Sequence, residues 1–447
     1  MCAPTSSADP LPYLQGLYQF LPAQRLDFIL HQTGRHSRRR RRLPAPAVSW
    51  LVIAMALFPT LPIPQVWRRL HPSTDDPEPA ESAFTQARQR LGIAPLRRLF
   101  LEVARPMASH QTVGAFYRGW RLMGLDSTVL DLRDTPANDR AFGRPGTGRA
   151  PGAFPQLRLL ALCELGTHAV CGAVLKPCRR NEQVMVPPLL GLLEPSMLLL
   201  WDRGFFGYES ARRVIEAGAH LLARVPAGLA LPAERRLPDG SYLTALYPSA
   251  ADRARRRGGL ALRVIEYTHD DPNRLGCGER HRLVTDLLEP SELPAAEAPL
   301  VYHERWEEEL TIDEIKNHLG SRPLALRSKT PAGVVQEVYG LLLAHYVVRR
   351  LMHDAAVMAS VDPDRLSFSN ALRVLQCHLP ESPRKAVALW DGDLLRELRR
   401  LRLRPRRTRW YPRVIKQKMS NWKKKRPEHR HPPQPTKPFQ EAIVVLI

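Results

Sequence analysis

The sequence predicts a mixed α/β protein in which a region of strands is flanked by two helical regions. Short apolar or alternating runs, typical of strands, cluster between residues 115 and 226. Helix-compatible spacing of apolar residues covers residues 1 to about 110 and resumes at Tyr302. Residues 228–300 are rich in Pro, Gly and Arg and contain further short apolar runs, which predicts a β-rich insertion.

The N-terminal region, residues 1–112, is expected to be entirely helical. Its most apolar run, Ala47 to Phe58, is too short to span a bilayer and therefore predicts a buried helix. A second segment, Glu81 to Gly92, has the pattern of a capped helix with Arg88 and Arg90 near its end. It is either the second helix of a helix-turn-helix or an ordinary amphipathic helix, and composition does not separate the two.

The central region predicts a meander of strands followed by a strand–helix–strand unit, which together indicate a mixed sheet. The runs of the meander are RLMGLDSTVLDL, LRLLALCEL and HAVCGAVLKP. The later unit consists of MLLLWDRG and AHLLARVP, with the helical segment YESARRVIEAG between them.

The charge of the chain favours a polyanionic partner. The sequence has 66 Lys and Arg against 44 Asp and Glu, a formal net charge of +22. Such an excess suits phosphate neutralisation, although a basic proteome gives the same balance.

The run Arg38 to Arg42 offers phosphate contacts or forms a solvated linker. The last 57 residues carry 17 Lys and Arg against 5 Asp and Glu, with Trp410, Tyr411 and Trp422 among them, and either clamp DNA or form a disordered tail.

Other features of composition point to a reducing compartment. The six cysteines form no CxxC pair and no zinc-like spacing. The first residues, MCAPTSSADP, lack the basic and apolar segments of a signal peptide. We therefore expect a soluble, cytosolic protein that faces nucleic acid and makes no use of a membrane.

The segment Tyr302 to Leu319 is expected to be one helix with an unusual polar face. Each residue of a helix is rotated by about 100° from the one before. One face of this helix, within an arc of about 60°, therefore carries Tyr302, Arg305, Glu309 and Lys316. Such a face suits a metal-binding carboxylate beside a phosphodiester, or it is a ladder of salt bridges on a solvent face. Glu308 falls nearer the apolar side and Asp313 shares the polar face, so the helix alone leaves the important carboxylate open.

Two aspartates complete a candidate metal site. Asp126 closes the apolar run LMGLD, and Asp202 closes MLLLWD before the turn residues RGFFG. Hard divalent ions take oxygen ligands, and phosphoryl transfer with such ions uses several convergent carboxylates. Asp126, Asp202 and Glu309 therefore make a possible three-carboxylate site, although each aspartate alone is a common way to end a strand.

These residues resemble the insertion-sequence-4 family of DDE transposases from bacterial mobile elements. The spacing of Tyr302, Arg305, Glu309 and Lys316 matches the family's signature of Tyr, two residues, Arg, three residues, Glu, six residues, Lys. The segments GLDSTVLDLRDTPANDRAFGRP and LLLWDRGFFGYES are similar to the family's two aspartate motifs. Stretches of the N-terminal region and the tail WYPRVIKQKMSNW match as well, so the resemblance covers nearly the whole chain.

The resemblance implies an RNase H-like mixed-sheet catalytic core. In that core Asp126 lies on the first strand, Asp202 on the fourth, and Glu309 on the helix after the β-rich insertion. These three would hold two Mg²⁺ ions, for which Mn²⁺ substitutes, about 3.5–4 Å apart. Phosphates or a displaced base at the DNA end would be held by Tyr302, Arg305 and Lys316. No other cofactor is implied.

Further DNA contacts are expected after the signature helix. Arg327 and Lys329, in the segment RSKT, offer their charges to DNA phosphates, with a helix cap as the equal alternative. Some family members stack an insertion-domain tryptophan on a flipped base, but this chain has no tryptophan between Trp201 and Trp306. The residue that stacks instead would be one of three tyrosines, Tyr242, Tyr247 or Tyr267.

The implied domains are a helical DNA-binding domain at 1–112, a catalytic domain at 113–380 with the insertion at about 228–300, and a basic helical region at 381–447. The implied activity is Mg²⁺-dependent cleavage at insertion-sequence ends and strand transfer into target DNA. The partners would be terminal inverted repeats, target DNA and a second protomer in a synaptic homodimer, in the bacterial cytoplasm at the nucleoid. The alternatives are an RNase H-like nuclease without strand transfer and an inactive DNA-binding relic.

Overall fold

The computed structural model describes residues 12–446 except 38, 40, 72–77, 148–149, 227, 275–276, 320–324 and 404–434. The chain divides into two compact units, each described by itself below. Unit 1 comprises residues 1–192 and 306–403, and unit 2 comprises residues 193–305 and 404–447. Residues 404–434 of the predicted basic tail, with Trp410, Tyr411 and Trp422, lie outside the described residues.

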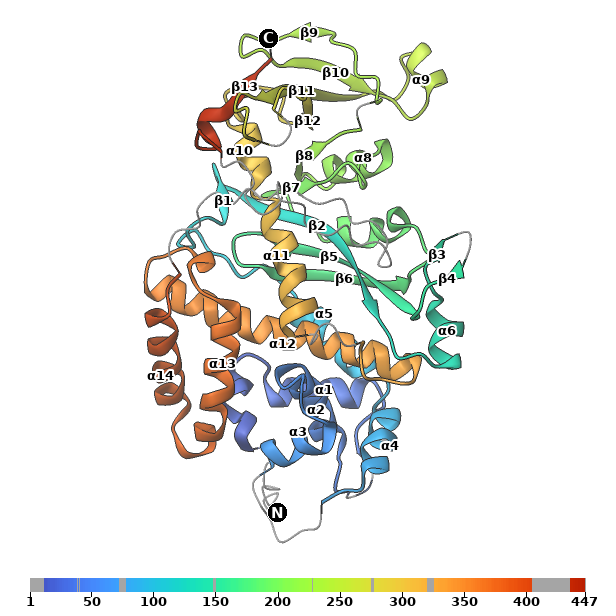
Figure 1. The fold of residues 1–447 in the computed structure, drawn as a ribbon, viewed down its shortest axis with the longest axis vertical. Helices are drawn as coiled ribbons and strands as arrows, with labels where there is room; N and C mark the ends of the chain where they lie inside the picture. Colours follow the sequence, from blue (N-terminus) through green and yellow to red (C-terminus); the bar gives the residue numbers. More distant parts are fainter. Residues whose placement is uncertain are drawn as a thin grey trace. The chain divides into compact units, whose positions relative to one another are not determined.

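The N-terminal part of unit 1 is helical, as the sequence predicts (Figure 1). Its helices are η1 (Pro12–Gln19), α1 (Ala23–Gln32), α2 (Ala45–Leu57), α3 (Ile63–Leu70), α4 (Glu81–Leu91) and α5 (Ala94–Val103). Helix α2 is apolar on all sides and almost wholly buried, which is the pattern of a helix at the centre of a core.

The sheet of unit 1 is an antiparallel meander. Strand β2 (Trp120–Asp131) pairs with β5 (Gln156–Glu164), and β5 pairs with β6 (Ala169–Pro177). Shorter elements accompany it, namely β1 (Phe116–Tyr117), α6 (Pro136–Phe142), β3 (Gly146–Thr147), β4 (Ala150–Pro151), η2 (Glu182–Met185) and α7 (Pro187–Leu190). The register of β2 and β5 sets Asp126 opposite Ala161.

A second group of helices completes unit 1. It consists of α11 (Trp306–Asp313), the π-helical segment η3 (Glu314–Leu319), α12 (Pro331–Met358), η4 (Pro363–Arg365), α13 (Phe368–His378), η5 (Leu379–Arg384) and α14 (Val387–Arg400). The long helix α12 packs against α2, α5, α13 and α14 (Figure 1). One apolar core therefore joins the N-terminal helices, α12 to α14 and one face of the sheet.

Unit 2 begins with the predicted strand–helix–strand unit. Strands β7 (Met197–Trp201) and β8 (His220–Arg224) are parallel and are connected by α8 (Tyr208–Glu216). An antiparallel set follows in the order β8, β12 (His281–Thr285), β11 (Leu260–His269), β10 (Tyr242–Leu246) and β9 (Arg235–Arg236). The remaining elements are α9 (Ala250–Ala254), α10 (Ala298–His303), η6 (Gln440–Ala442) and β13 (Ile443–Val445), which pairs with β11.

The predicted mixed α/β class is confirmed, with antiparallel strands first and a parallel pair later. Strands β9 to β12 bear out the β-rich character expected of residues 228–300. Among the described residues, no helix is both long enough and apolar enough to cross a membrane.

Gly340 lets α12 approach α2 closely. A Cβ added at Gly340 would lie 2.7 Å from the backbone oxygen of Val52, which is closer than a real Cβ contact. We expect Gly340→Ala to lower the free energy of unfolding by about 1–3 kcal/mol, because the rigid backbone cannot yield. Gly392→Ala is the matched control, since nothing lies within 4 Å of that position in α14 and alanine favours a helix there. Guanidinium denaturation followed by circular dichroism would compare them, and equal stabilities would contradict this packing.

Candidate active site

Asp126 lies in the middle of β2. The alternation of side chains along the strand decides which face of the sheet its carboxylate lies on. Gly124, Asp126 and Thr128 point to the same side of β2, because side chains alternate along a strand. The backbone N–H of Ser127 donates to Oδ1 of Asp126 at 2.7 Å, which fixes one orientation of the carboxylate.

Helix α11 and the segment η3 lie along this face of β2. Oε2 of the fully buried Glu308 lies 2.5 Å from where a Cβ of Gly124 would be, so a larger residue there would require the Glu308 side chain to move. Two turns later, Nζ of Lys316 donates to Oγ1 of Thr128 at 3.1 Å. Asp126 lies between these two contact points on the strand, and Glu309 directly follows Glu308 on the helix.

The expectation of one continuous helix from Tyr302 to Leu319 is wrong. Helix α10 ends at His303, Glu304 and Arg305 form a turn, and α11 begins at Trp306. The N–H groups of Glu304 and Arg305 bond carbonyls three residues back, at Val301 and Tyr302, which tightens the chain there. The division between the two units falls at this turn, so the signature residues are shared between them.

Unit 2 brings together the other predicted residues. Asp202 follows β7 directly, and its Oδ1 accepts from the N–H of Arg203 at 2.8 Å. The hydroxyl of Tyr302 donates to the backbone oxygen of Trp201 at 3.3 Å, next to Asp202. The guanidinium of Arg305 lies over the ring of Tyr302, 5.8 Å from its centroid. Burial, with the charge of Asp202, raises the pKa of Tyr302, so the phenol stays protonated.

The donor set suits a hard divalent cation. Asp126, Asp202 and Glu309 offer carboxylate oxygens, the ligands that Mg²⁺ prefers. Asp126 and Glu309 lie in unit 1, and Asp202 lies in unit 2. The nearby thiol of Cys163 adds no softer ligand, because burial, with Glu308 and Asp126, raises its pKa well above the ordinary value.

Arg327 and Lys329 have different surroundings. The guanidinium of Arg327 donates to the backbone oxygens of Met55, Pro59 and Leu61 at 2.7–3.1 Å, at the end of α2. These bonds favour a structural role for Arg327 over a contact with DNA, which stays a prediction. Lys329 is exposed, and its side chain is available to a phosphate.

The structure also separates the three candidate tyrosines in unit 2. Tyr242 and Tyr267 are buried, and the hydroxyl of Tyr242 donates to the backbone oxygen of Leu231 at 3.2 Å. Tyr247 is only half-buried, beside Gly259. Of the three, Tyr247 presents the most accessible ring.

A pocket in the N-terminal helical region is lined by arginines that the sequence left ambiguous. Its lining includes Arg35, Arg39 and Arg41 from the loop after α1, and Arg90 from the end of α4. All four side chains are exposed, and none of the described lining residues is acidic. The other arginine of α4, Arg88, faces inward and donates to Ser328 Oγ and the Gly333 backbone oxygen at 2.9 Å.

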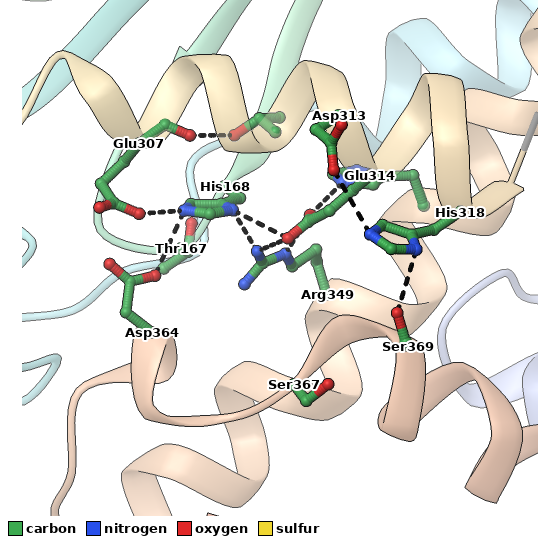
Figure 2. A network of polar contacts seen from close by, with 12 residues as sticks. Thr167, His168, Glu307, Asp313, Glu314, His318, Arg349, Asp364, Ser367 and Ser369 are labelled. Atoms are coloured by element: carbon green, nitrogen blue, oxygen red, sulfur yellow. Dashed lines mark hydrogen bonds and ion pairs between the residues drawn. The ribbon is translucent and has the colours of Figure 1, made fainter. Parts of the chain in front are cut away.

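On another face, helix α11–η3 is attached by a buried polar network that the sequence did not reveal (Figure 2). Glu314 is buried, and its Oε2 accepts from Nε of Arg349 at 2.8 Å and from Nε2 of His345 at 3.0 Å. Burial opposes its ionisation, but Arg349 and His168 outweigh this and hold the pKa of Glu314 well below its ordinary value. The carboxylate is therefore charged and ties η3 to α12.

His168 extends this network to two further carboxylates (Figure 2). Its Nδ1 lies 3.2 Å from Oε1 of Glu314, while its Nε2 lies 3.0 Å from Glu307 Oε2 and 3.2 Å from Asp364 Oδ1. Burial and Arg349 lower the pKa of His168, but Glu314 and Asp364 outweigh them and raise it to about 10. No motif in the sequence signals this cluster, because its residues come from three distant segments.

The buried charge of Glu314 is expected to be essential to stability. Glu314→Gln would leave the buried Arg349 and the protonated His168 without their shared anion, at a cost of about 3–5 kcal/mol in the free energy of unfolding. Asp313→Asn changes an exposed side chain one residue earlier, and should alter the free energy of unfolding by about 0.5 kcal/mol or less. Chemical denaturation of both variants measures the difference, and a loss for Glu314→Gln no larger than for the control would refute the role of the network.

Comparison with known proteins identifies the family of this chain. Residues 12–101 match the family described as insertion element 4 transposase N-terminal, and residues 121–347 match the transposase DDE domain. The chain is 30% identical over 417 residues to the transposase InsG for insertion sequence element IS4 of Escherichia coli (strain K12), covering 91% of this chain and 92% of InsG.

Of two further similar proteins, one matches a smaller share of the chain and the other has a lower sequence identity. The putative transposase InsZ of the same organism is 30% identical over 223 residues, which cover 49% of this chain and 73% of InsZ. A cryo-EM structure of the piggyBac transposase synaptic complex with hairpin DNA is 13% identical, with a TM-score of 0.47, over 88% of this chain and 85% of that one. From the family matches and the likeness to InsG, the chain belongs to the insertion-element-4 family of DDE transposases.

Proposed function

We propose that this transposase cleaves DNA at the ends of its insertion sequence and joins those ends to target DNA in a metal-dependent reaction. The observation that carries the proposal is the placement of α11–η3 along β2. Lys316 bonds Thr128, and Glu308 lies over Gly124, so the helix that carries Glu309 lies against the strand that carries Asp126. Asp202, beside Tyr302 in unit 2, would complete the set.

The proposal includes an RNase H-like catalytic core. Strands β2, β5 and β6 form an antiparallel meander, and β7 and β8 form a parallel pair connected by a helix, which supports such a core. The proposed ligands Asp126 and Glu309 belong to unit 1, and Asp202 belongs to unit 2. The domain division at 1–112, 113–380 and 381–447 belongs to the same proposal.

Asp126, Asp202 and Glu309 would hold two Mg²⁺ ions, with Mn²⁺ as a substitute. Bound there, the ions would activate a water molecule or a DNA 3′-OH for in-line attack. They would also stabilise the leaving oxygen. Hydrogen bonds from the N–H of Ser127 and of Arg203 would keep the two aspartates oriented. No serine or tyrosine nucleophile is then required.

Tyr302, Arg305 and Lys316 would hold the DNA. The phenol of Tyr302 would donate to a phosphate oxygen after giving up its bond to the backbone oxygen of Trp201, and because it stays protonated it is a poor nucleophile. Arg305 is oriented by the ring of Tyr302, and the ammonium of Lys316 lies at Thr128, two residues from Asp126. These cations would lie beside the carboxylates and neutralise the phosphodiester. Lys329 would add a contact further along the chain.

The arginine-lined pocket would bind the DNA backbone away from the cleavage site. Four exposed guanidinium groups, with no acidic residue in the described lining, make this pocket attractive to an anion. Phosphate oxygens suit guanidinium groups, which bind them through paired hydrogen bonds. This pocket supports a DNA-binding role for the N-terminal helical region, and favours phosphate contact for the run Arg38 to Arg42.

The partners of the reaction would be the terminal inverted repeats, the target DNA and a second protomer. Pairing of two ends requires two active sites, so a homodimer would form the synaptic complex, acting on DNA of the bacterial cytoplasm and nucleoid. A nuclease without strand transfer remains the alternative, and joining of a cut end to a second DNA separates the two.

Glu309 provides the direct test of the chemistry. A labelled duplex that carries the element's own end would be incubated with the full chain in Mg²⁺ or in EDTA at low salt. We expect cutting at the element boundary that requires Mg²⁺ and is lost in Glu309→Gln, because the neutral amide no longer balances the charge of the metal ions.

The control for this experiment is Asp313→Asn. Asp313 is an exposed carboxylate on the same helix, 3.4 Å from Nε2 of His318, and its loss should leave cutting unchanged. Equal cutting by Glu309→Gln and wild type would remove Glu309 from the site. Binding without cutting by every form of the protein would favour the inactive relic.

Arg90 tests the arginine-lined pocket. If Arg90 contacts a phosphate, Arg90→Ala should weaken binding about equally for element-end and unrelated duplexes, and lower the slope of log affinity against log salt by about 1. Arg98→Ala is the control, since Arg98 is an exposed arginine of α5 whose Nε lies 3.0 Å from Glu102. Fluorescence anisotropy across a salt series gives both slopes, and identical slopes for the two variants would reject the pocket.

A further inference from the structure

Beside Glu309, but on a different face of α11, three side chains from separate segments converge on one point (Figure 2). His168 comes from the turn between β5 and β6, Glu307 from α11, and Asp364 from η4. Their ligand atoms all lie within 4.8 Å of one another. All three residues belong to unit 1.

The distances suit a metal ion. Nε2 of His168 lies 3.0 Å from Glu307 Oε2 and 3.2 Å from Asp364 Oδ1. Ligand atoms about 2.1 Å from one metal ion, at angles near 90°, are about 3 Å apart, so an ion fits between these atoms without a large movement. Glu307 and Asp364 keep side-chain exposures of 15% and 16%, which leaves room for water as a further ligand.

The second nitrogen of His168 faces the carboxylate of Glu314, and the guanidinium of Arg349 contacts the same nitrogen. A histidine that binds a metal through one ring nitrogen usually donates the other N–H to a carboxylate, which fixes the ring. Nδ1 of His168 lies 3.2 Å from Oε1 of Glu314. Glu314 is fixed in turn by Arg349 and His345, so the outer contacts of a metal site are present.

The backbone at His168 supports the same conclusion. His168 has a φ of 56°, in the left-handed region that side chains other than glycine rarely adopt. Residues held in that region persist only where their surroundings fix them, and they cluster at functional sites. Here the unusual backbone brings a completely buried imidazole to two carboxylates.

The charges of the cluster also balance with a divalent ion. Glu307, Glu314 and Asp364 contribute three negative charges, and Arg349 contributes one positive charge. These four groups carry a net charge of −2, which a divalent cation would balance at this largely buried position.

We infer that His168, Glu307 and Asp364 form a binding site for one divalent transition-metal ion, separate from the carboxylates proposed for DNA cleavage. The imidazole ligand favours Mn²⁺, Co²⁺ or Zn²⁺ over Mg²⁺, which prefers oxygen ligands alone. The ion would join α11 to η4 and to the turn after β5. It would therefore fasten the helix that carries Glu309 without taking part in cleavage.

The test measures metal binding in a protein that lacks the proposed cleavage ligands. The full chain, without a histidine tag, would carry Asp126→Asn, Asp202→Asn and Glu309→Gln. Titration with Co²⁺, followed by its visible absorption and by equilibrium dialysis, should show one ion per chain. Zn²⁺ should displace the Co²⁺, and millimolar Mg²⁺ should not.

Variants of the two carboxylates identify the site. Glu307→Gln and Asp364→Asn, each added to that background, should weaken Co²⁺ binding at least tenfold. Asp313→Asn, an exposed carboxylate of α11, is the matched control and should leave the affinity unchanged. These substitutions avoid His168, whose replacement could prevent folding, and circular dichroism would confirm that each variant is folded.

Two outcomes would overturn the inference. One is the absence of stoichiometric Co²⁺ binding, in which case His168 acts as an imidazolium held by three carboxylates. The other is binding that Glu307→Gln and Asp364→Asn leave unchanged, which would place the metal elsewhere, for example on the histidines of the C-terminal tail. Mg²⁺-dependent cleavage by the wild-type protein is measured separately, so either outcome leaves the proposed function standing.

Discussion

The buried ion pair between Glu314 and Arg349 is the interaction on which the proposed site most depends. The helix that carries Glu309 has few apolar side chains, so packing alone holds it weakly, and a buried carboxylate is costly without a cation. Arg349 supplies that cation from α12, the longest helix of unit 1. Since α12 is itself fixed against α2, the position of Glu309 is linked to the core of the N-terminal helices.

Glycine and arginine at a few positions make this arrangement possible. Gly340 allows α12 to approach α2, and Gly124 allows α11 to approach β2. Arg88 and Arg327 hydrogen-bond backbone and side-chain oxygens inside unit 1, so part of the large positive charge serves folding and the rest remains for a polyanion. A count of basic residues in the sequence cannot separate these two uses.

Much of this structure could be predicted from the sequence, because its signals are local. The alternation in RLMGLDSTVLDL predicts β2, and the apolar run Ala47 to Phe58 predicts the buried helix α2. The interruption at Glu304 and Arg305 could not be predicted, since both residue types suit a helix and no glycine or proline marks the break. The cluster around His168 was missed for a related reason: His168, Glu307 and Asp364 are more than 50 residues apart in the chain, and no spacing rule connects them.

The π-helical segment Glu314–Leu319 gives the signature spacing a meaning beyond a count of residues. A π-helix places more residues in each turn than an α-helix, and such segments are kept mostly where a local geometry is needed. Shortening this segment by one residue would restore a regular α-helix and rotate Lys316 away from Thr128 relative to Glu309. The six-residue interval between Glu309 and Lys316 therefore fixes how far Lys316 is rotated about the helix axis relative to Glu309. Proteins of this family would be sensitive to insertions and deletions there even when every signature residue is retained.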